Sequence, residues 1–222
     1  IWADPDKVRP MSKQNAFRRE HGLNGKFVVM YAGNIGHTSC LEDILHAAEI
    51  LQAKKDIQFV IVGEGVKKGS LEAEMQARQL NNILFLPFQP REAFPEMLAA
   101  ADLGLVTLNA GAALSSLPSK IFNVMASARP ILAVTPPGSE IMQIVEEAGC
   151  GWNVPPQSPE KLAEVIIQLK ERESELTQIG QNGRACLEKN YSRNHCVDEY
   201  EKMLAVLCDR NLLKTARVGG TL

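Results

Sequence analysis

Continuous apolar runs alternate with helical patterns along most of this chain, and that alternation limits its fold more than any other feature. The first run extends from Lys26 to Ala32 and ends at Gly33, as expected for a strand that is buried on both faces. The segment 41–52 then carries apolar residues at the spacing of a helix. Neighbouring parallel strands are joined by a crossover connection, which is usually such a helix.

The same pairing of strand and helix recurs six times. We predict strands at 26–32, 57–63, 83–86, 103–106, 131–134 and 151–154, and helices at 41–52, 70–80, 91–101, 119–127, 139–148 and 159–213, the last broken near 180–183 or 190–192. This order predicts an α/β fold, a Rossmann-like doubly wound parallel sheet of about six strands with extra C-terminal helices. Ligands of such sheets bind beyond the carboxyl ends of the strands.

Composition supports one domain and excludes several classes of function. A chain of 222 residues with 45% hydrophobic content suits a single large domain. The net charge of −2 and the 5% aromatic content argue against a nucleic-acid partner. The five cysteines are scattered without a CxxC pair, so we expect neither a metal site nor disulfides, and a reducing, cytoplasmic compartment. We find no transmembrane run and no signal peptide.

The two ends of the chain differ from its centre. Residues 1–24 are polar and rich in turns, and we interpret them as a linker that enters the domain from an upstream part. Residues 25–207 form the predicted domain, and 208–222 a flexible tail. The chain begins at Ile1 without an initiator Met, which favours a fragment of a longer protein.

The segment from Ser115 to Ala126 points most directly to a ligand. A polar loop here leads into the first turn of a short apolar helix that carries Lys120. The backbone N–H groups at such a helix start attract anions, and a lysine there is unfavourable unless an anion is bound. The small, pliable loop 107–114 precedes it. We therefore predict a phosphate-bearing ligand at this segment.

Turns after the other strands could contribute. Gly33-Asn34-Ile35-Gly36 and Gly63-Glu64-Gly65 allow tight turns and close approach of a ligand, although a turn without a ligand explains them equally well. The first is not GxGxxG and no acidic residue ends the second strand, so a nicotinamide dinucleotide is poorly supported. Phe88 follows the third strand, where a base could rest. His37 is interpreted as a solvated loop residue rather than a catalytic one.

In their order and spacing, these sequence segments resemble the C-terminal, donor-binding half of retaining GT-B glycosyltransferases of family 4. The resemblance runs from about Ile1 to Leu207 and includes the strand and turn 28–36, the strand and turn 59–65, and the segments 84–92 and 99–103. Ile1-Trp2-Ala3-Asp4 resembles the hinge to the acceptor domain. The resemblance implies transfer of a hexosyl or N-acetylhexosaminyl group from a nucleoside-diphosphate sugar, with retention, in polysaccharide biosynthesis.

This chain departs from the family's pattern at its charged positions. Ser115 and Asn123 stand where the family carries the two glutamates of a Glu-x7-Glu motif that meet the donor sugar and the ribose. Asn34 and Ser39 stand where it commonly has an arginine and a lysine beside the diphosphate. That leaves Lys120 and the helix amides as the main visible counter-charge for the leaving nucleoside diphosphate, with Arg91 or an upstream residue as a further candidate.

We expect the following roles from the resemblance and the residues together. Lys120 and Ser115 are the catalytic candidates, and the donor, expected to be a UDP-sugar, is bound by Gly33, Asn34, Gly36, Gly63, Gly65, Phe88, Ser116, Pro118, Ser119, Ile121 and Asn123. The diphosphate is expected on the amides of 119–121 and the ribose on Asn123. No cofactor is implied.

The expected partners are the nucleotide-sugar donor and the N-terminal acceptor domain of the full-length chain, without which the fragment would be inactive. A lipid-linked acceptor would bring the protein to the inner face of the membrane. Three alternatives stay open: a non-catalytic sugar-nucleotide-binding subunit, a sugar-nucleotide epimerase of the same architecture, and a nucleotide-responsive regulatory domain. Activity of the full-length protein would exclude the first, and acceptor-independent product formation would identify the second.

Overall fold

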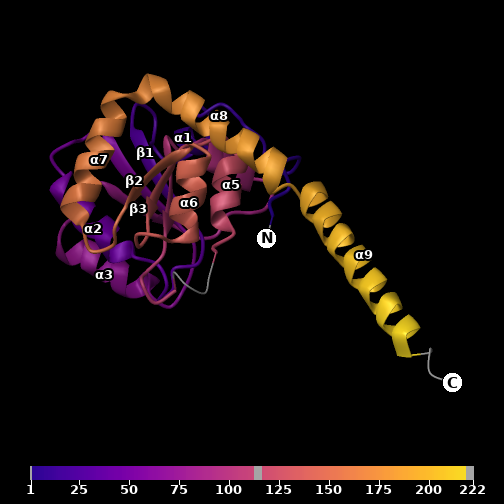
Figure 1. Cartoon of the computed structure of the whole chain (residues 1–222). Helices are drawn as coiled ribbons and strands as arrows, with labels where there is room; N and C mark the ends of the chain where they lie inside the picture. Colours follow the sequence, from indigo (N-terminus) through magenta and orange to yellow (C-terminus); the bar gives the residue numbers. More distant parts are fainter. Residues whose placement is uncertain (1, 113–116, 219–222) are drawn as a thin grey trace.

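The fold is a six-stranded parallel sheet between two layers of helices, in a computed structural model that describes residues 2–112 and 117–218, with side chains up to residue 208 (Figure 1). The strand order is β3-β2-β1-β4-β5-β6, and every neighbouring pair is parallel. The strands are β1 (Phe27–Ala32), β2 (Ile57–Val62), β3 (Ile83–Leu86), β4 (Leu103–Thr107), β5 (Ile131–Val134) and β6 (Gly151–Val154). The predicted α/β fold is confirmed.

The helices alternate with the strands up to β6 and then follow one another. They are α1 (Ala16–Glu20), α2 (Leu41–Ile50), α3 (Lys68–Ala77), α4 (Phe94–Ala99), α5 (Lys120–Ala126), α6 (Glu140–Glu147), α7 (Pro159–Glu171), α8 (Glu173–Asn190) and α9 (Arg193–Val218). Figure 1 shows α9 as an arm that leaves the body of the domain. The tail predicted from residue 208 is thus helical as far as Val218.

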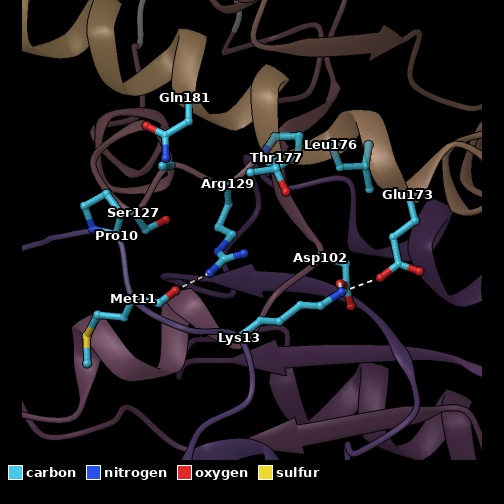
Figure 2. A pocket seen from close by; sticks show the side chains of 12 residues that line it. Pro10, Met11, Lys13, Asp102, Ser127, Arg129, Glu173, Leu176, Thr177 and Gln181 are labelled. Atoms are coloured by element: carbon cyan, nitrogen blue, oxygen red, sulfur yellow. Dashed lines mark hydrogen bonds and ion pairs between the residues drawn. The ribbon is translucent and has the colours of Figure 1, made fainter.

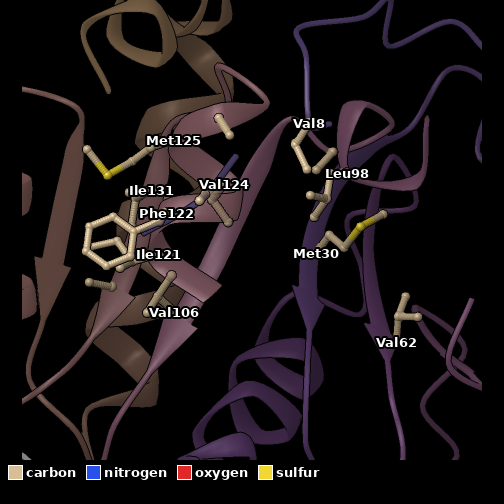
Figure 3. Close-up of a cluster of buried hydrophobic side chains, with 14 of the residues drawn as sticks. Val8, Met30, Val62, Leu98, Val106, Ile121, Phe122, Val124, Met125 and Ile131 are labelled. Atoms are coloured by element: carbon tan, nitrogen blue, oxygen red, sulfur yellow. The ribbon is translucent and has the colours of Figure 1, made fainter. Parts of the chain in front are cut away.

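Both faces of the sheet are buried, which explains why the strands are apolar without alternation. On β1, Val28 and Met30 belong to a cluster with α4, α5 and α6. Val29 and Tyr31 belong to the opposite cluster, with α2, α3 and α7. Because hydrophobic side chains are needed on both sides, the sequence shows a continuous apolar run. Figure 3 shows part of the first cluster.

Of the two predicted positions for the break in the last helical segment, 190–192 is confirmed and 180–183 is wrong. The breaks fall at Arg172 and at residues 191–192, and the glycines lie inside α8. A β-carbon at Gly180 would lie 2.1 Å from the carbonyl oxygen of Ala128, and one at Gly183 would lie 3.0 Å from the Cβ of Cys150. These glycines let α8 approach the turn before β5, so they serve packing and do not end a helix.

Residues 2–24, which the sequence predicts as a linker, pack against the domain. Val8 and Phe17 are buried in the first cluster, and Figure 3 shows Val8 with Leu98. The fully buried Arg18 pairs with Asp102 and donates to the carbonyl of Ala100 over 2.8 Å. Such buried charges need partners, and they hold this segment in one arrangement.

The cap of α6 yields a first prediction. Ser139 is the N-cap residue, and its hydroxyl accepts a hydrogen bond from the amide of Met142 over 3.3 Å. We expect Ser139→Ala to lower the free energy of unfolding by about 1 kcal/mol, measured by urea denaturation. Ser158→Ala is the control, because Ser158 occupies the N-cap of α7 without a side-chain bond to that helix. Equal losses in the two variants would contradict the assignment.

Candidate functional site

A pocket of about 350 Å³ lies at the carboxyl edge of the sheet, where β1 and β4 are neighbours. The order in which strands are added to the sheet reverses between β1 and β4. From β1 the chain adds β2 and β3 on one side, and from β4 it adds β5 and β6 on the other. Open α/β sheets bind ligands at this point. The pocket is lined by Ala32, Gly33, Asn34, Thr38, Val62, Phe88, Gln89, Phe94, Met97, Thr107, Leu108, Pro118, Ser119, Lys120 and Asn123.

Two loops from opposite sides of this point are tied together above the sheet. The amide of Asn109, after β4, donates to the carbonyl of Thr38 over 2.9 Å, and its side-chain amide donates to the carbonyl of His37 over 2.7 Å. His37 is exposed and is not among the lining residues, in line with a solvated loop residue. The hydrogen bonds of Asn109 therefore fix the rim of the pocket rather than a reacting group.

Gly63 and Gly65 position the first turn instead of lining the pocket. A β-carbon at Gly63, where φ is +155°, would lie 1.9 Å from the carbonyl oxygen of Gly33. One at Gly65, where φ is +154°, would lie 2.3 Å from the carbonyl oxygen of Ile35. The amide of Ile35 also donates to the carbonyl of Glu64 over 2.8 Å. Only glycine allows the two backbones to come so close.

Lys120 is the only charged residue among the described residues that line the pocket. Its ammonium donates to the hydroxyl of Tyr31 and lies 4.0 Å from the centroid of that ring. A β-carbon at Gly33 would lie 3.1 Å from Lys120 Nζ, so the ammonium rests on the turn after β1. Within the described part of the chain, no carboxylate oxygen lies within 4.0 Å of it.

Burial changes the proton affinity of this lysine. Desolvation lowers the pKa of Lys120 from 10.5 to about 8, because burial disfavours the charged form and no anion offsets it. The ammonium is then still the main form at pH 7. A half-buried cation without an anionic partner makes this pocket a favourable place for an anionic ligand.

The other predicted binding residues fall into separate groups. Asn34, Phe88, Pro118, Ser119 and Asn123 line the pocket with Gly33 and Lys120, and Phe88 is 57% exposed. Gly36 does not line it; its carbonyl accepts from the hydroxyl of Ser39 over 2.7 Å. Ser115 and Ser116 lie outside the described residues.

The predicted role of the Ile121 amide needs correction. This amide already donates to the carbonyl of Pro118 over 3.3 Å, and the side chain of Ile121 is fully buried in the core. Helix α5 has only seven residues and no side-chain cap. The field of so short a helix is small, so the attraction for an anion rests on Lys120.

Two polar residues inside strands were missed by sequence reasoning: Thr107, which lines the pocket, and Tyr31, which contacts Lys120. Tyr31 looks like an ordinary member of the apolar run in β1, and Thr107 like the last residue of β4. Thr107 is 2% exposed, and its hydroxyl has no hydrogen-bond partner among the described residues. A polar atom inside a strand that is otherwise buried on both faces was the available signal for both.

A second cavity, of about 270 Å³, lies at the opposite edge, where β4 and β5 begin (Figure 2). Lys13 contacts the carboxylates of both Asp102 and Glu173 there. Arg129 donates to the carbonyl of Met11 over 2.6 Å. These charged groups attach the N-terminal segment to the domain, so we assign them a structural role.

The described residues contain no group of three or more His, Cys, Asp or Glu side chains that could hold a metal ion. Among the helices that the structure describes, none is long and apolar enough to span a membrane.

Comparisons with known proteins agree with this architecture. Residues 13–185 match the family model of the glycosyl transferases group 1. The probable glycosyltransferase WbjE of Pseudomonas aeruginosa is 32% identical over 98% of this chain and 52% of its own length. The putative colanic acid biosynthesis glycosyl transferase WcaI of Escherichia coli (strain K12) is 36% identical over 69% of this chain and 38% of its own length. The chain thus spans about half the length, or less, of these curated relatives.

Solved structures share the fold. Anabaena Alr3699/HepE in complex with UDP-glucose superposes with a TM-score of 0.80 at 18% identity, over 92% of this chain and 56% of that protein. The C-terminal domain of LpcC, a glycosyl transferase group 1 family protein from Francisella tularensis, gives 0.70 at 22% identity, over 86% of this chain and 99% of that domain. The resemblance inferred from the motifs is confirmed, and the chain belongs to the glycosyl transferases group 1 family.

Proposed function

We propose that this chain is the donor-binding domain of a retaining glycosyltransferase and holds a nucleoside-diphosphate sugar in the pocket between β1 and β4. The observation that carries the proposal is Lys120, a half-buried ammonium without an acidic partner among the described residues, placed where the sheet offers its ligand site. A diphosphate supplies the missing negative charge, and the same ammonium stabilises the charge that develops on the leaving nucleotide.

The pocket offers a partner for each part of the donor. Lys120 contacts the diphosphate. Asn123 lies about one helical turn further along α5, and its side-chain amide binds the ribose hydroxyls. The exposed ring of Phe88 provides a surface for the base. Ser115 and Ser116 are not among the described residues; in this proposal they contact the sugar or the phosphate.

A UDP-sugar is our first choice of donor, with a hexosyl or N-acetylhexosaminyl group transferred. The solved complex of HepE with UDP-glucose supports UDP as the nucleotide. No charged residue besides Lys120 lines the pocket within the described part of the chain, so the protein offers the diphosphate one counter-ion there.

The acceptor belongs on a second domain, and this domain alone is expected to be inactive. Two observations support this arrangement. The chain spans about half of its curated relatives. Helix α9 leaves the body of the domain and exposes Tyr200, Met203, Leu204 and Leu207, so its apolar side chains are free to meet another domain (Figure 1). A lipid-linked acceptor would hold the full-length enzyme at the cytoplasmic face of a membrane.

Thermal unfolding with UDP-, GDP- and ADP-sugars tests the proposal. A ligand at a hundred times its dissociation constant adds about 2.7 kcal/mol to the free energy of unfolding. For a domain of this size, we expect UDP or a UDP-sugar to raise the melting temperature by about 8 °C. The absence of a shift with every nucleotide, at millimolar concentration, would contradict the donor site.

A further inference from the structure

Tyr31 connects the two elements that form the floor of the pocket. Tyr31 is the penultimate residue of β1, and its side chain is fully buried, yet its hydroxyl reaches the carboxyl edge of the sheet. There it accepts a hydrogen bond from Lys120 Nζ and donates one to the carbonyl of Asn34 over 2.6 Å. One phenol thus joins the start of α5 to the turn after β1.

This phenol donates one hydrogen bond and accepts another in fixed directions. A tyrosine hydroxyl has a single proton, which points to Asn34, so its oxygen lone pairs face the lysine. The face of the ring adds attraction to the ammonium at 4.0 Å. Gly33 leaves room for the ammonium, since a β-carbon there would lie 3.1 Å from Nζ. A flexible lysine is therefore restricted to one place.

We propose that Tyr31 is a positioning residue, which holds the Lys120 ammonium at the end of β1 where it meets the diphosphate of the donor. This inference rests on the proposed function. Holding the side chain before the ligand arrives lowers the entropy that binding must otherwise cost, and lysine has more of this entropy to lose than most residues. Tyr31 acts through Lys120 and has no contact of its own with the reacting atoms.

The proton states around this pair suit the role. Burial raises the pKa of Tyr31 to about 12, so the phenol remains a neutral donor to Asn34 at physiological pH. Besides Lys120, the titratable group next to Tyr31 is the Cys40 thiol at the start of α2, and burial raises its pKa to about 11. Since neither group titrates near pH 8, a transition there belongs to Lys120, whose pKa lies at about 8.

Two measurements on Tyr31→Phe test the inference. The first is the NMR titration of the Lys120 side chain, assigned with Lys120→Arg. Loss of the phenol oxygen removes an acceptor from the charged form, so the midpoint is expected to fall by about one pH unit. The second is UDP affinity at pH 7 by calorimetry, expected to weaken by about tenfold. Tyr191→Phe is the matched control, because Tyr191 packs on Phe122 on the other side of α5, with ring centroids 4.8 Å apart.

The outcomes separate the inference from the proposed function. Both changes in Tyr31→Phe, with neither in Tyr191→Phe, support the inference. An unchanged midpoint, or unchanged UDP affinity despite a moved midpoint, overturns it. If the wild type itself binds no UDP, the proposed function fails, whereas the midpoint still decides whether Tyr31 holds the ammonium. Melting temperatures of the variants confirm that each is folded.

Discussion

Lys120→Met is expected to weaken UDP binding by about 30-fold, which corresponds to roughly 2 kcal/mol. Methionine keeps most of the aliphatic length of lysine but cannot carry the charge that faces the diphosphate. Calorimetric titration with UDP at pH 7 and low salt measures the effect. The matched control is Lys68→Met, because Lys68 also begins a helix but is paired with Glu64 over 2.7 Å and does not line the pocket.

The ligand-free Lys120→Met variant is expected to be at least as stable as the wild type at pH 7. The folded protein lowers the pKa of Lys120 from 10.5 to about 8, so between these values the unfolded chain binds more protons. Wild-type stability therefore rises as the pH increases from 8 to 10.5, and the variant lacks this rise. Weaker UDP binding combined with a large loss of stability would instead mean that Lys120 serves the fold.

Gly63→Ala is expected to be the most destabilising single substitution near the pocket. The added β-carbon would lie 1.9 Å from a backbone oxygen of Gly33, at a φ of +155° that alanine adopts only under strain. Backbone cannot move aside as a side chain can, so we expect a loss of about 3 kcal/mol and a fall in melting temperature of roughly 10 °C. UDP affinity should fall too, because Gly33 supports the ammonium of Lys120.

Gly69→Ala is the control for this substitution. Gly69 lies in α3, and a β-carbon there would meet nothing within 4 Å. Alanine should raise the free energy of unfolding by about 0.5–1 kcal/mol, since glycine loses more chain entropy in a helix. If Gly63→Ala were as stable as Gly69→Ala, the close backbone packing of the two turns would be wrong.

The strands could be predicted from the sequence because burial on both faces leaves a local signal. The predicted ranges 131–134 and 151–154 coincide with β5 and β6. Helix breaks were harder to predict, since Gly180 has the local character of a breaker and yet packs inside α8 against Ala128. Its function depends on a contact with a distant segment, which the local pattern does not contain.

The site likewise contains residues with a local sequence signal and residues whose role depends on a distant contact. Lys120 was recognisable because a lysine at a helix start conflicts with local electrostatics. Its partner Tyr31 lies 89 residues earlier in the chain, and a hydroxyl in an apolar strand does not identify the lysine that it contacts. Gly63 and Gly65 were predicted to approach a ligand, whereas each approaches another backbone. A glycine signals close approach but does not identify what approaches.

A crystal structure of this chain with UDP tests the central claim most directly. The account predicts the nucleotide in the pocket between β1 and β4, with a diphosphate oxygen about 3 Å from Lys120 Nζ and Tyr31 still bonded to the ammonium. UDP bound with its diphosphate away from Lys120, for example in the cavity at the amino edge of the sheet, would contradict it.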